Sequence, residues 1–359
     1  MDRRNRWSAM TLVADVRRRI GSLQLDASFS IDKGETIAVV GPNGAGKTSL
    51  VRTIAGLAAV DEGRIAWDEF VWDESGSGVF VSPERRPIGY VFQDHALFEH
   101  LSVLDNVAFG LRASGIGRRD ARTRARVVLE IVGGLKFEQR MPSELSGGES
   151  QTVAIARALA TEPKLMLFDE PFAALDTSAR AEARRLFVAM ANPSMSRILV
   201  THDAVEALTL ADRIIAIEDG SIVQIGTPSE LLAMPRSHFV AEILGLNALS
   251  GQLNGDQLSI GSMSLTVGAH EALDGNVIAI IRPRSVSLHQ TRPEGSPRNV
   301  WNSSVVAVDR TADRVRVQLG APLNISVEVT PAGFDALHTE VGADLWASVK
   351  ASEVAVHPA

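Results

Sequence analysis

The sequence has no cysteine among its 359 residues. Disulfides, thiolate metal sites and cysteine nucleophiles are therefore excluded, and a reducing compartment is compatible with the composition. Aromatic residues are scarce, at 5% of the chain. No apolar run approaches the roughly 18 residues that a membrane-spanning helix requires. We therefore do not expect the chain to cross a bilayer by itself.

An excess of positive charge is also missing, because the formal net charge is −7. Binding along nucleic-acid phosphates needs a basic face, so nucleic acid is not expected as a partner. The arginines between 118 and 126 lie with Asp120 and Glu130 and without interleaved aromatics, and this pattern indicates a solvated helix face. The basic opening MDRRNRW leads into no apolar signal core, so we expect a protein of the cytosolic side.

The chain is long enough for two or three domains, since domains usually span about 100 to 200 residues. A content of 45% hydrophobic and 22% charged residues is ordinary for a globular protein and argues against disorder. After about residue 245 the pattern shifts to short alternating strands. We predict one domain over 1–245 and an all-β domain over 246–359.

Residues 41–48 read GPNGAGKT, which fits G-x-x-x-x-G-K-[ST] at every fixed position. The apolar run 36–40 predicts a buried strand before it, and 49–55 predicts a helix that ends at Gly56. Glycines let backbone N–H groups surround an anion, while Lys47 offers a charge to the outer phosphates and Thr48 a hydroxyl to Mg²⁺. The predicted phosphate-binding residues are Gly41, Pro42, Asn43, Gly44, Ala45, Gly46, Lys47 and Thr48.

Three further strands are predicted to end in polar side chains. The strand at 88–92 is followed by Gln93, the strand at 164–168 by Asp169 and Glu170, and the strand at 197–200 by His202. Parallel strands open towards a ligand at their carboxyl ends. Asp169 suits Mg²⁺ held through water, and Glu170 can accept a proton from an attacking water. Gln93 can sense the metal or that water, and His202 can hydrogen-bond the terminal phosphate.

Residues 145–149, LSGGE, precede a helix predicted over 152–160. Ser146, Gly147 and Gly148 at a helix N-terminus form a second anion site, or alternatively a plain helix cap. The second site can serve the same nucleotide or that of a neighbouring subunit. Between the two glycine sites, 104–140 has a helical pattern, and the apolar residues of 96–103 predict a docking surface or local packing.

Together these motifs resemble the ATP-binding subunit of an ABC transporter over about residues 11–245. The resemblance implies an α/β P-loop NTPase fold with a helical subdomain at about 95–160. It implies Glu170 as the catalytic base, with His202 and Gln93 as catalytic partners. It also implies ATP, and Mg²⁺ held by Thr48, Gln93 and Asp169 partly through water.

The same resemblance implies a homodimer in which each ATP lies between the Gly41–Thr48 loop of one subunit and Ser146 to Gly148 of the other. Residues 96–103 would then receive integral-membrane permease subunits, at the cytoplasmic face of the cell membrane, with an extracytoplasmic substrate-binding protein as an indirect partner. Two features depart from the family. Glu149 and Ser150 replace a glutamine and a basic residue, and Leu23 stands where an adenine-stacking aromatic is expected, which leaves ATP-over-GTP preference open.

The second domain contains an internal repeat. AIIRPRSVSLH at 279–289 aligns with ASVKASEVAVH at 347–357, and Asn247 echoes Asn299 at the start of each copy. The repeat predicts two barrel-forming halves near 247–289 and 299–357.

This part resembles the molybdate-binding Mop or TOBE domains, small OB-like β-barrels appended to importer ATPases. SPRN at 296–299 matches that family's opening with proline in place of alanine, and VKAS at 349–352 matches its closing segment. The resemblance implies an oxyanion site of Ser296, Arg298, Asn299, Lys350 and Ser352. A purely structural barrel without a ligand stays open, and Pro297 removes one backbone donor.

The sequence therefore predicts the ATP-hydrolysing subunit of an ABC importer that powers molybdate uptake. Importers of tungstate, sulfate, ferric iron or sugars remain alternatives within the class. From other classes, a soluble ABC protein not coupled to transport and a protein that only stores or senses oxyanions remain open.

Overall fold

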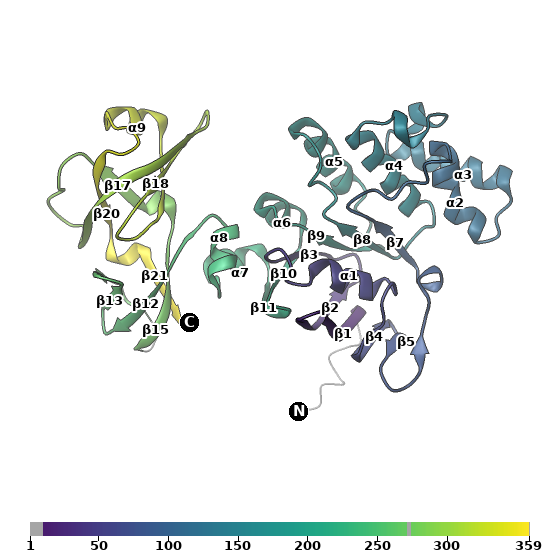
Figure 1. Ribbon diagram of the computed structural model, residues 1–359, viewed down its shortest axis with the longest axis horizontal. Helices are drawn as coiled ribbons and strands as arrows, with labels where there is room; N and C mark the ends of the chain where they lie inside the picture. The colour runs from purple at the N-terminus through teal and green to yellow at the C-terminus, as the bar shows by residue number, and fades with distance from the viewer. Residues whose placement is uncertain (1–9, 271–273, 359) are drawn as a thin grey trace. The chain divides into compact units, whose positions relative to one another are not determined.

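The computed structural model describes residues 10–270 and 274–358. The chain divides into two compact units, Met1–Pro228 and Ser229–Ala359 (Figure 1). The second unit includes a helix, α8 (His238–Ile243), ahead of its first strand, and the predicted domain boundary at 245 stays a prediction. Within the described ranges, no helix is long and apolar enough to span a membrane.

One 11-stranded sheet forms the framework of the first unit. Its parallel half has the order β7 (Ile88–Val91), β8 (Leu165–Asp169), β9 (Ser196–Val200), β3 (Thr36–Val40) and β10 (Arg213–Glu218). Every residue of β3, β8 and β9 is buried, as expected for apolar strands covered on both faces. The carboxyl ends of these strands bring the segments after 40, 91, 169 and 200 to one edge.

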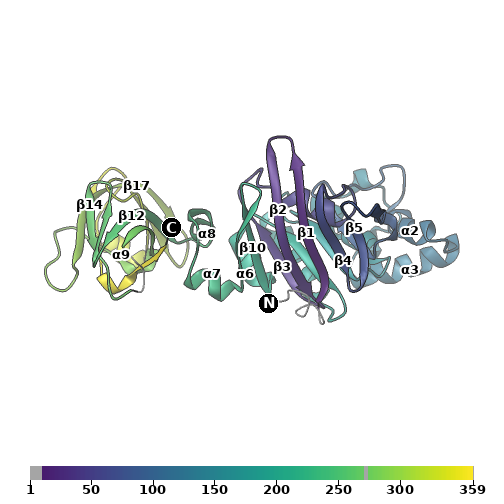
Figure 2. The same ribbon diagram turned by 90° about the horizontal axis from the view of Figure 1, so that it is seen from below.

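The other half of the sheet is mainly antiparallel. It continues from β10 through β11 (Ser221–Gly226), β2 (Leu23–Asp32), β1 (Met10–Ile20), β4 (Glu62–Trp67), β5 (Phe70–Glu74) and β6 (Val79–Phe80). Strands β1 and β2 run side by side as a long hairpin (Figure 2). The helix α1 (Lys47–Ile54) buries Leu50 and Ile54 in a core that it shares with Leu25 of β2 and Leu167 of β8. That core anchors the helix that follows the phosphate loop.

Helices gather beside the β7 end of the sheet (Figure 1). They are α2 (Val103–Ala113), α3 (Arg118–Ile131) and α4 (Gly147–Leu159), followed in the chain by α5 (Thr177–Ala189) and α6 (Ala204–Leu210). The helical pattern of 104–140 is therefore two helices and a short 3-10 turn at Leu135–Phe137, because the chain reverses at Gly115, where φ is +90°. Helix α4 begins five residues before the predicted 152, since Ser146 caps it.

The second unit contains two five-stranded antiparallel sheets. The first has the order β14 (Met263–Thr266), β13 (Gln257–Ile260), β12 (Asn247–Asn254), β15 (Gly275–Ile281) and β21 (Val354–Pro358). The second has the order β16 (Val286–His289), β20 (Asp344–Val349), β17 (Asn299–Arg310), β18 (Val315–Leu319) and β19 (Ser326–Val329). Short helices α7 (Pro228–Ala233) and α9 (Pro331–Ala336) complete the list.

The two sheets of this unit exchange their last strands. In both halves a strand, a 3-10 turn and a second strand follow one another, and the second strand pairs in the sheet of the other half, so that Ile281 pairs with Val354 and Val286 with Val349. The two opening asparagines also have matching partners. Asn247 exchanges two hydrogen bonds with the backbone of Ser326, and Asn299 does the same with Thr266.

Candidate functional site

The Gly41–Thr48 loop connects β3 to α1 and is built around glycines. Gly44 and Gly46 have φ of +82° and +102°, which side chains rarely adopt, and a Cβ on Gly41 would lie 2.2 Å from the carbonyl oxygen of Ile217. Residues 42–44 are exposed, whereas Ala45 is buried against the core. The loop therefore presents its backbone to solvent directly before the N-terminus of α1, where free N–H groups favour an anion.

Lys47 closes the loop from inside. Its Nζ donates hydrogen bonds to the carbonyl oxygens of Gly41 (2.8 Å) and Pro42 (2.9 Å), and the side chain is buried. Burial lowers the pKa of Lys47 below its ordinary value, and the nearby carboxylates of Glu170 and Asp169 offset only part of this shift. A phosphate arriving at this loop would offer the ammonium stronger acceptors than two carbonyls.

Thr48 and Asp169 meet at the carboxyl edge of the sheet, although 121 positions separate them. The Thr48 hydroxyl donates to Asp169 Oδ1 at 2.8 Å, and Asp169 is 2% exposed. A hydroxyl beside a carboxylate is the hard oxygen set that Mg²⁺ takes when phosphates and waters complete its shell. Within the described part of the chain, no group of three or more His, Asp or Glu side chains is placed to hold a metal ion. These residues fit Mg²⁺.

Glu170 and His202 face each other beyond β8 and β9. The His202 Nδ1 lies 3.4 Å from Glu170 Oε2, and the imidazole is largely exposed while the carboxylate is mostly buried. Glu170 has a φ of +49° and its N–H donates to the carbonyl oxygen of Val200. A left-handed backbone at a non-glycine residue is strained and is found disproportionately at functional sites.

A charged network behind His202, which sequence reasoning missed, ties its segment to α5. Arg184 donates to Asp203 Oδ2 (3.1 Å) and Glu206 Oε1 (2.9 Å), and the hydroxyl of Thr201 donates to Glu206 Oε2 (2.5 Å). Asp203 also caps α6 through the N–H of Glu206. The cap joins residues three positions apart, so a short stretch of sequence can predict it. The bonds from Arg184 span 19 and 22 positions, and no short stretch of sequence predicts them.

Gln93 lies just past β7 and is exposed. The segment after it is held by two side chains that the sequence did not single out. Arg157 of α4 donates to the carbonyl oxygens of His95 (2.8 Å) and Ala96 (2.5 Å). Asn106 of α2, fully buried, exchanges hydrogen bonds with the backbone of Phe98. These bonds give the connection at 96–103 a defined shape.

Ser146, Gly147 and Gly148 stand at the start of α4. Ser146 accepts a hydrogen bond from the N–H of Glu149 (3.3 Å), and the Glu149 carboxylate accepts from the N–H of Ser146 (2.8 Å), which is a capping box. In the described ranges, no hydrogen bond or ion pair joins these three residues to the Gly41–Thr48 loop. They cap their own helix, and Ser146 and Gly147 are exposed.

Leu23 borders the phosphate loop. Its Cδ2 lies 3.3 Å from the position of a Cβ on Gly46, and its Cδ1 lies 3.3 Å from one on Gly220. The half-buried leucine therefore occupies the edge where the base of a nucleotide was expected.

The oxyanion candidates of the second unit differ in how exposed their side chains are. Ser296, Arg298, Lys350 and Ser352 are exposed, whereas Asn299 is 2% exposed and uses its amide on Thr266. The turn with Ser352 lies against Gly268, whose N–H donates to the carbonyl oxygen of Ala351. The matching turn of the other half carries Arg284, which pairs with Glu328 at 2.7 Å.

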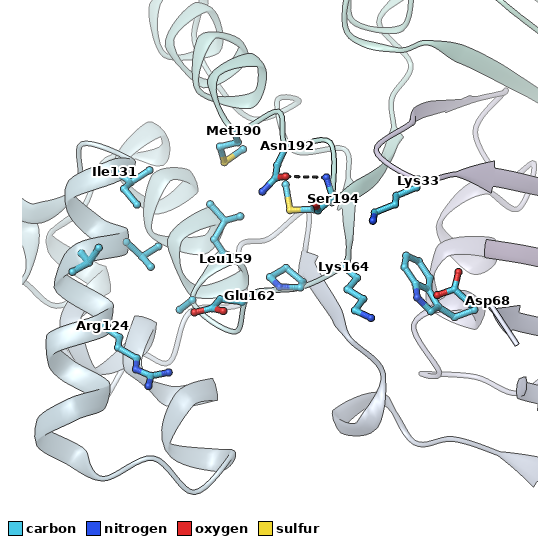
Figure 3. A pocket seen from close by; sticks show the side chains of 16 residues that line it. Lys33, Asp68, Arg124, Ile131, Leu159, Glu162, Lys164, Met190, Asn192 and Ser194 are labelled. Atoms are coloured by element: carbon cyan, nitrogen blue, oxygen red, sulfur yellow. Dashed lines mark hydrogen bonds between the residues drawn. The ribbon is translucent and has the colours of Figure 1, made fainter. Parts of the chain in front are cut away.

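A pocket of about 840 Å³ lies elsewhere in the first unit (Figure 3). Lys33 and Lys164 point into it, between Ile131 and Leu159 on one side and Asp68 on the other (Figure 3). Lys164 and Ser194 precede β8 and β9, so this pocket opens at the amino edge of the parallel strands. None of the predicted nucleotide residues lines it, and volume alone does not mark the candidate site.

Comparison with known proteins assigns a family to each part of the chain. Residues 25–173 match the ABC transporter family, and residues 295–356 match the TOBE domain. The molybdenum import ATP-binding protein ModC of Mycobacterium tuberculosis (strain H37Rv) is 39% identical, over 96% of this chain and 97% of its own length. The sulfate/thiosulfate import ATP-binding protein CysA of Bacillus cereus (strain ATCC 14579) is 36% identical, over 95% and 97%.

Solved structures resemble about two thirds of the chain. The protein cbiO1 from Clostridium perfringens, part of the ABC transporter complex cbiONQ, superposes with a TM-score of 0.55 at 30% identity, covering 64% of this chain and 92% of that one. A dimeric, post-hydrolysis ATP-binding cassette, MJ0796 bound to ADP and Pi, gives a TM-score of 0.54 at 28% identity, over 61% and 99%.

The predicted fold class is confirmed by these matches: a P-loop ATPase is followed by an antiparallel β-domain of the TOBE type. The two curated relatives named above align over 97% of their own length, and both are import ATP-binding proteins. The chain belongs to the ATP-binding subunits of ABC importers.

Proposed function

We propose that this protein hydrolyses ATP as a homodimer and thereby powers the uptake of molybdate. One observation carries the hydrolysis: the Thr48–Asp169 pair lies beside Glu170 and His202 at a single sheet edge, next to a glycine loop. Mg²⁺, when bound, supplies charge neutralisation between the outer phosphates, and Thr48, Asp169 and Gln93 would hold it.

Glu170 acts as the general base in this proposal. Its carboxylate takes a proton from the attacking water, and His202, within reach of that carboxylate, holds the terminal phosphate by a hydrogen bond. Lys47 exchanges its two carbonyl partners for phosphate oxygens. Each role belongs to a side chain that the fold already directs to the same edge.

The second glycine site is the reason to propose a homodimer. Among the described residues no hydrogen bond or ion pair joins Ser146, Gly147 or Gly148 to their own phosphate loop, and we assign these residues to the nucleotide of the partner subunit. The relative MJ0796 is described as dimeric after hydrolysis, which supports this arrangement. An anion at the start of α4 would be stabilised by the free N–H groups of a 13-residue helix.

We place the permease contact on 96–103, at the cytoplasmic face of the cell membrane, with an extracytoplasmic binding protein as an indirect partner. Phe98 packs against Phe109 with ring centroids 4.4 Å apart, and Phe109 is 44% exposed. The hydrogen bonds from Asn106 and Arg157 hold this apolar surface in shape. An ordered apolar surface next to Gln93 suits a docking helix.

The choice of molybdate rests on relatives and on the second unit. ModC aligns over 96% of the chain at 39% identity, and the exposed Lys350 and Ser352 suit a tetrahedral dianion. Sulfate is the second candidate, because CysA proteins are 35% to 42% identical and sulfate has the same shape and charge. Ser296 and Arg298 would contribute to the same oxyanion contact.

Uptake in cells tests the cargo. We expect deletion of this gene to abolish uptake of radiolabelled molybdate and to leave sulfate uptake unchanged, and the wild-type gene, but not Glu170→Gln, to restore it. Loss of sulfate uptake alone would transfer the assignment to sulfate. Unchanged uptake of both anions would contradict either cargo.

A further inference from the structure

Tyr90 is the only tyrosine in the chain and lies on β7, three residues before Gln93. Its hydroxyl donates a hydrogen bond to Asp169 Oδ2 at 3.0 Å. The other oxygen of the same carboxylate, Oδ1, accepts from Thr48 at 2.8 Å. Both oxygens of a 2% exposed carboxylate are thus engaged, one by the phosphate-loop helix and one by Tyr90.

The register of the sheet explains this contact. Tyr90 pairs with Leu167 in the parallel ladder of β7 and β8, and Asp169 projects from the same face as Leu167, two residues on. The tyrosine ring also stacks on Phe92, with centroids 4.1 Å apart and an angle of 27°. Because the ring is held between its strand and Phe92, the hydroxyl approaches Asp169 from a fixed direction.

The phenol donates to the Asp169 carboxylate from the position that its strand and Phe92 fix. A metal ligand held by a second partner in this way keeps its orientation.

We propose that Tyr90 is a positioning residue for Mg²⁺ binding, which orients the Asp169 carboxylate so that Oδ1 stays beside the Thr48 hydroxyl. The inference rests on the proposed metal role of Asp169. Without the phenol, one carboxylate oxygen loses its partner and the carboxylate is free to rotate away from Thr48. Tyr90 also joins the metal site to the strand that delivers Gln93, so both parts of the proposed site share one rigid support.

Tyr90→Phe keeps the ring and removes only the hydroxyl. We expect the half-saturating Mg²⁺ concentration for ATP hydrolysis to rise by about tenfold, as for the loss of other second-shell partners. The turnover number at saturating Mg²⁺ should stay within about twofold. Phe92→Leu is the matched control, because it disturbs the ring stack and keeps the phenol; an equal shift in that variant would assign the effect to packing and overturn the inference.

A second readout does not depend on turnover. Since the chain has one tyrosine, growth on 3-fluorotyrosine places a single ¹⁹F label at position 90. We expect the resonance to move when Mg²⁺ is added to the ATP-bound Glu170→Gln protein. This Mg²⁺-induced movement of the resonance should be lost in the double variant that carries both Glu170→Gln and Asp169→Asn.

The two readouts separate two kinds of failure. A wild-type protein without Mg²⁺-dependent hydrolysis would contradict the proposed function itself. The role of Tyr90 alone would be overturned by a different set of results. In that case the wild-type protein hydrolyses ATP, Tyr90→Phe has the same Mg²⁺ dependence of hydrolysis, and the Mg²⁺-induced movement of the ¹⁹F resonance is unchanged by Asp169→Asn.

Discussion

Glu170 combines a reactive position with a strained backbone. A φ of +49° costs a non-glycine residue about 1 to 3 kcal/mol, and the hydrogen bond from its N–H to Val200 helps to hold it there. The strain directs the carboxylate away from the buried strand β8 and towards His202. The fold therefore maintains a backbone conformation that a glutamate residue rarely adopts.

We expect Glu170→Gln to slow ATP hydrolysis by about 10² to 10⁴-fold, because an amide cannot accept the proton of the attacking water. Binding of ATP should persist, as measured with a fluorescent analogue. Glu162→Gln is the matched control, since Glu162 is exposed and also has a positive φ of 52°. A normal turnover number in the Glu170 variant would remove it from the role of base.

At this scale, local patterns predicted part of the site. Thr48, Asp169 and His202 each follow a recognisable apolar strand or glycine loop, so their meeting at one edge follows from the geometry of parallel strands. Tyr90 and Arg157 gave no such signal. Their partners lie 79 and 62 residues away, and the pairing depends on strand register and helix position, which no short window of sequence contains.

Among the elements, α2 and α3 are joined by a charged clamp. Asp105, in the first turn of α2, accepts two hydrogen bonds from Arg122 of α3, at 2.8 Å and 2.6 Å. The guanidinium holds the pKa of Asp105 below its ordinary value. One arginine of the α3 run is thus engaged between α3 and α2.

Asp105→Asn should lower the free energy of unfolding by about 1 kcal/mol at pH 7, the order expected for a partly exposed bidentate pair. Because the folded-state pKa lies below the unfolded one, the stabilisation is complete above the unfolded value. It is lost as the pH falls through the folded value. Urea titrations between pH 3 and 8 should show the two proteins converging only at the acidic end.

Asp120→Asn serves as the control for that series. Asp120 is exposed on α3 and makes no ion pair within the described residues. Asp120 lies in the first turn of its own helix, so this variant measures the helix-terminus contribution without an ion pair, and we expect a smaller shift of the urea midpoint than in Asp105→Asn. A pH-independent loss in Asp105→Asn would mean that the effect does not come from the ionised carboxylate that pairs with Arg122.

At the scale of the whole molecule, the proposed role of Ser146 in the dimer can be tested by substitution. Ser146→Arg should leave ATP binding to the isolated subunit intact, since no hydrogen bond or ion pair among the described residues joins Ser146 to the phosphate loop. It should abolish hydrolysis, because a large cation would occupy the surface proposed for the partner subunit's nucleotide. Equilibrium binding, sedimentation and turnover together test this expectation.

Ser143→Arg is the matched control for assembly, because Ser143 is exposed three residues earlier and outside the glycine motif. It should preserve turnover. Full activity in Ser146→Arg would contradict a site shared between subunits.

The fold class of the whole chain was predictable from motifs, but the exchange of strands in the second unit was not, since alternation predicts strands and not their partners.

The exchanged strands give the second unit a property that a duplicated domain does not ordinarily have. Strand β15 is completed by β21, and β20 by β16, so neither half possesses a finished sheet alone. A chain ending before Val354 would leave β15 with an open hydrogen-bonding edge, a template for misassembly between copies. The two halves should therefore melt together in one cooperative transition, and the repeat behaves as a single indivisible folding unit.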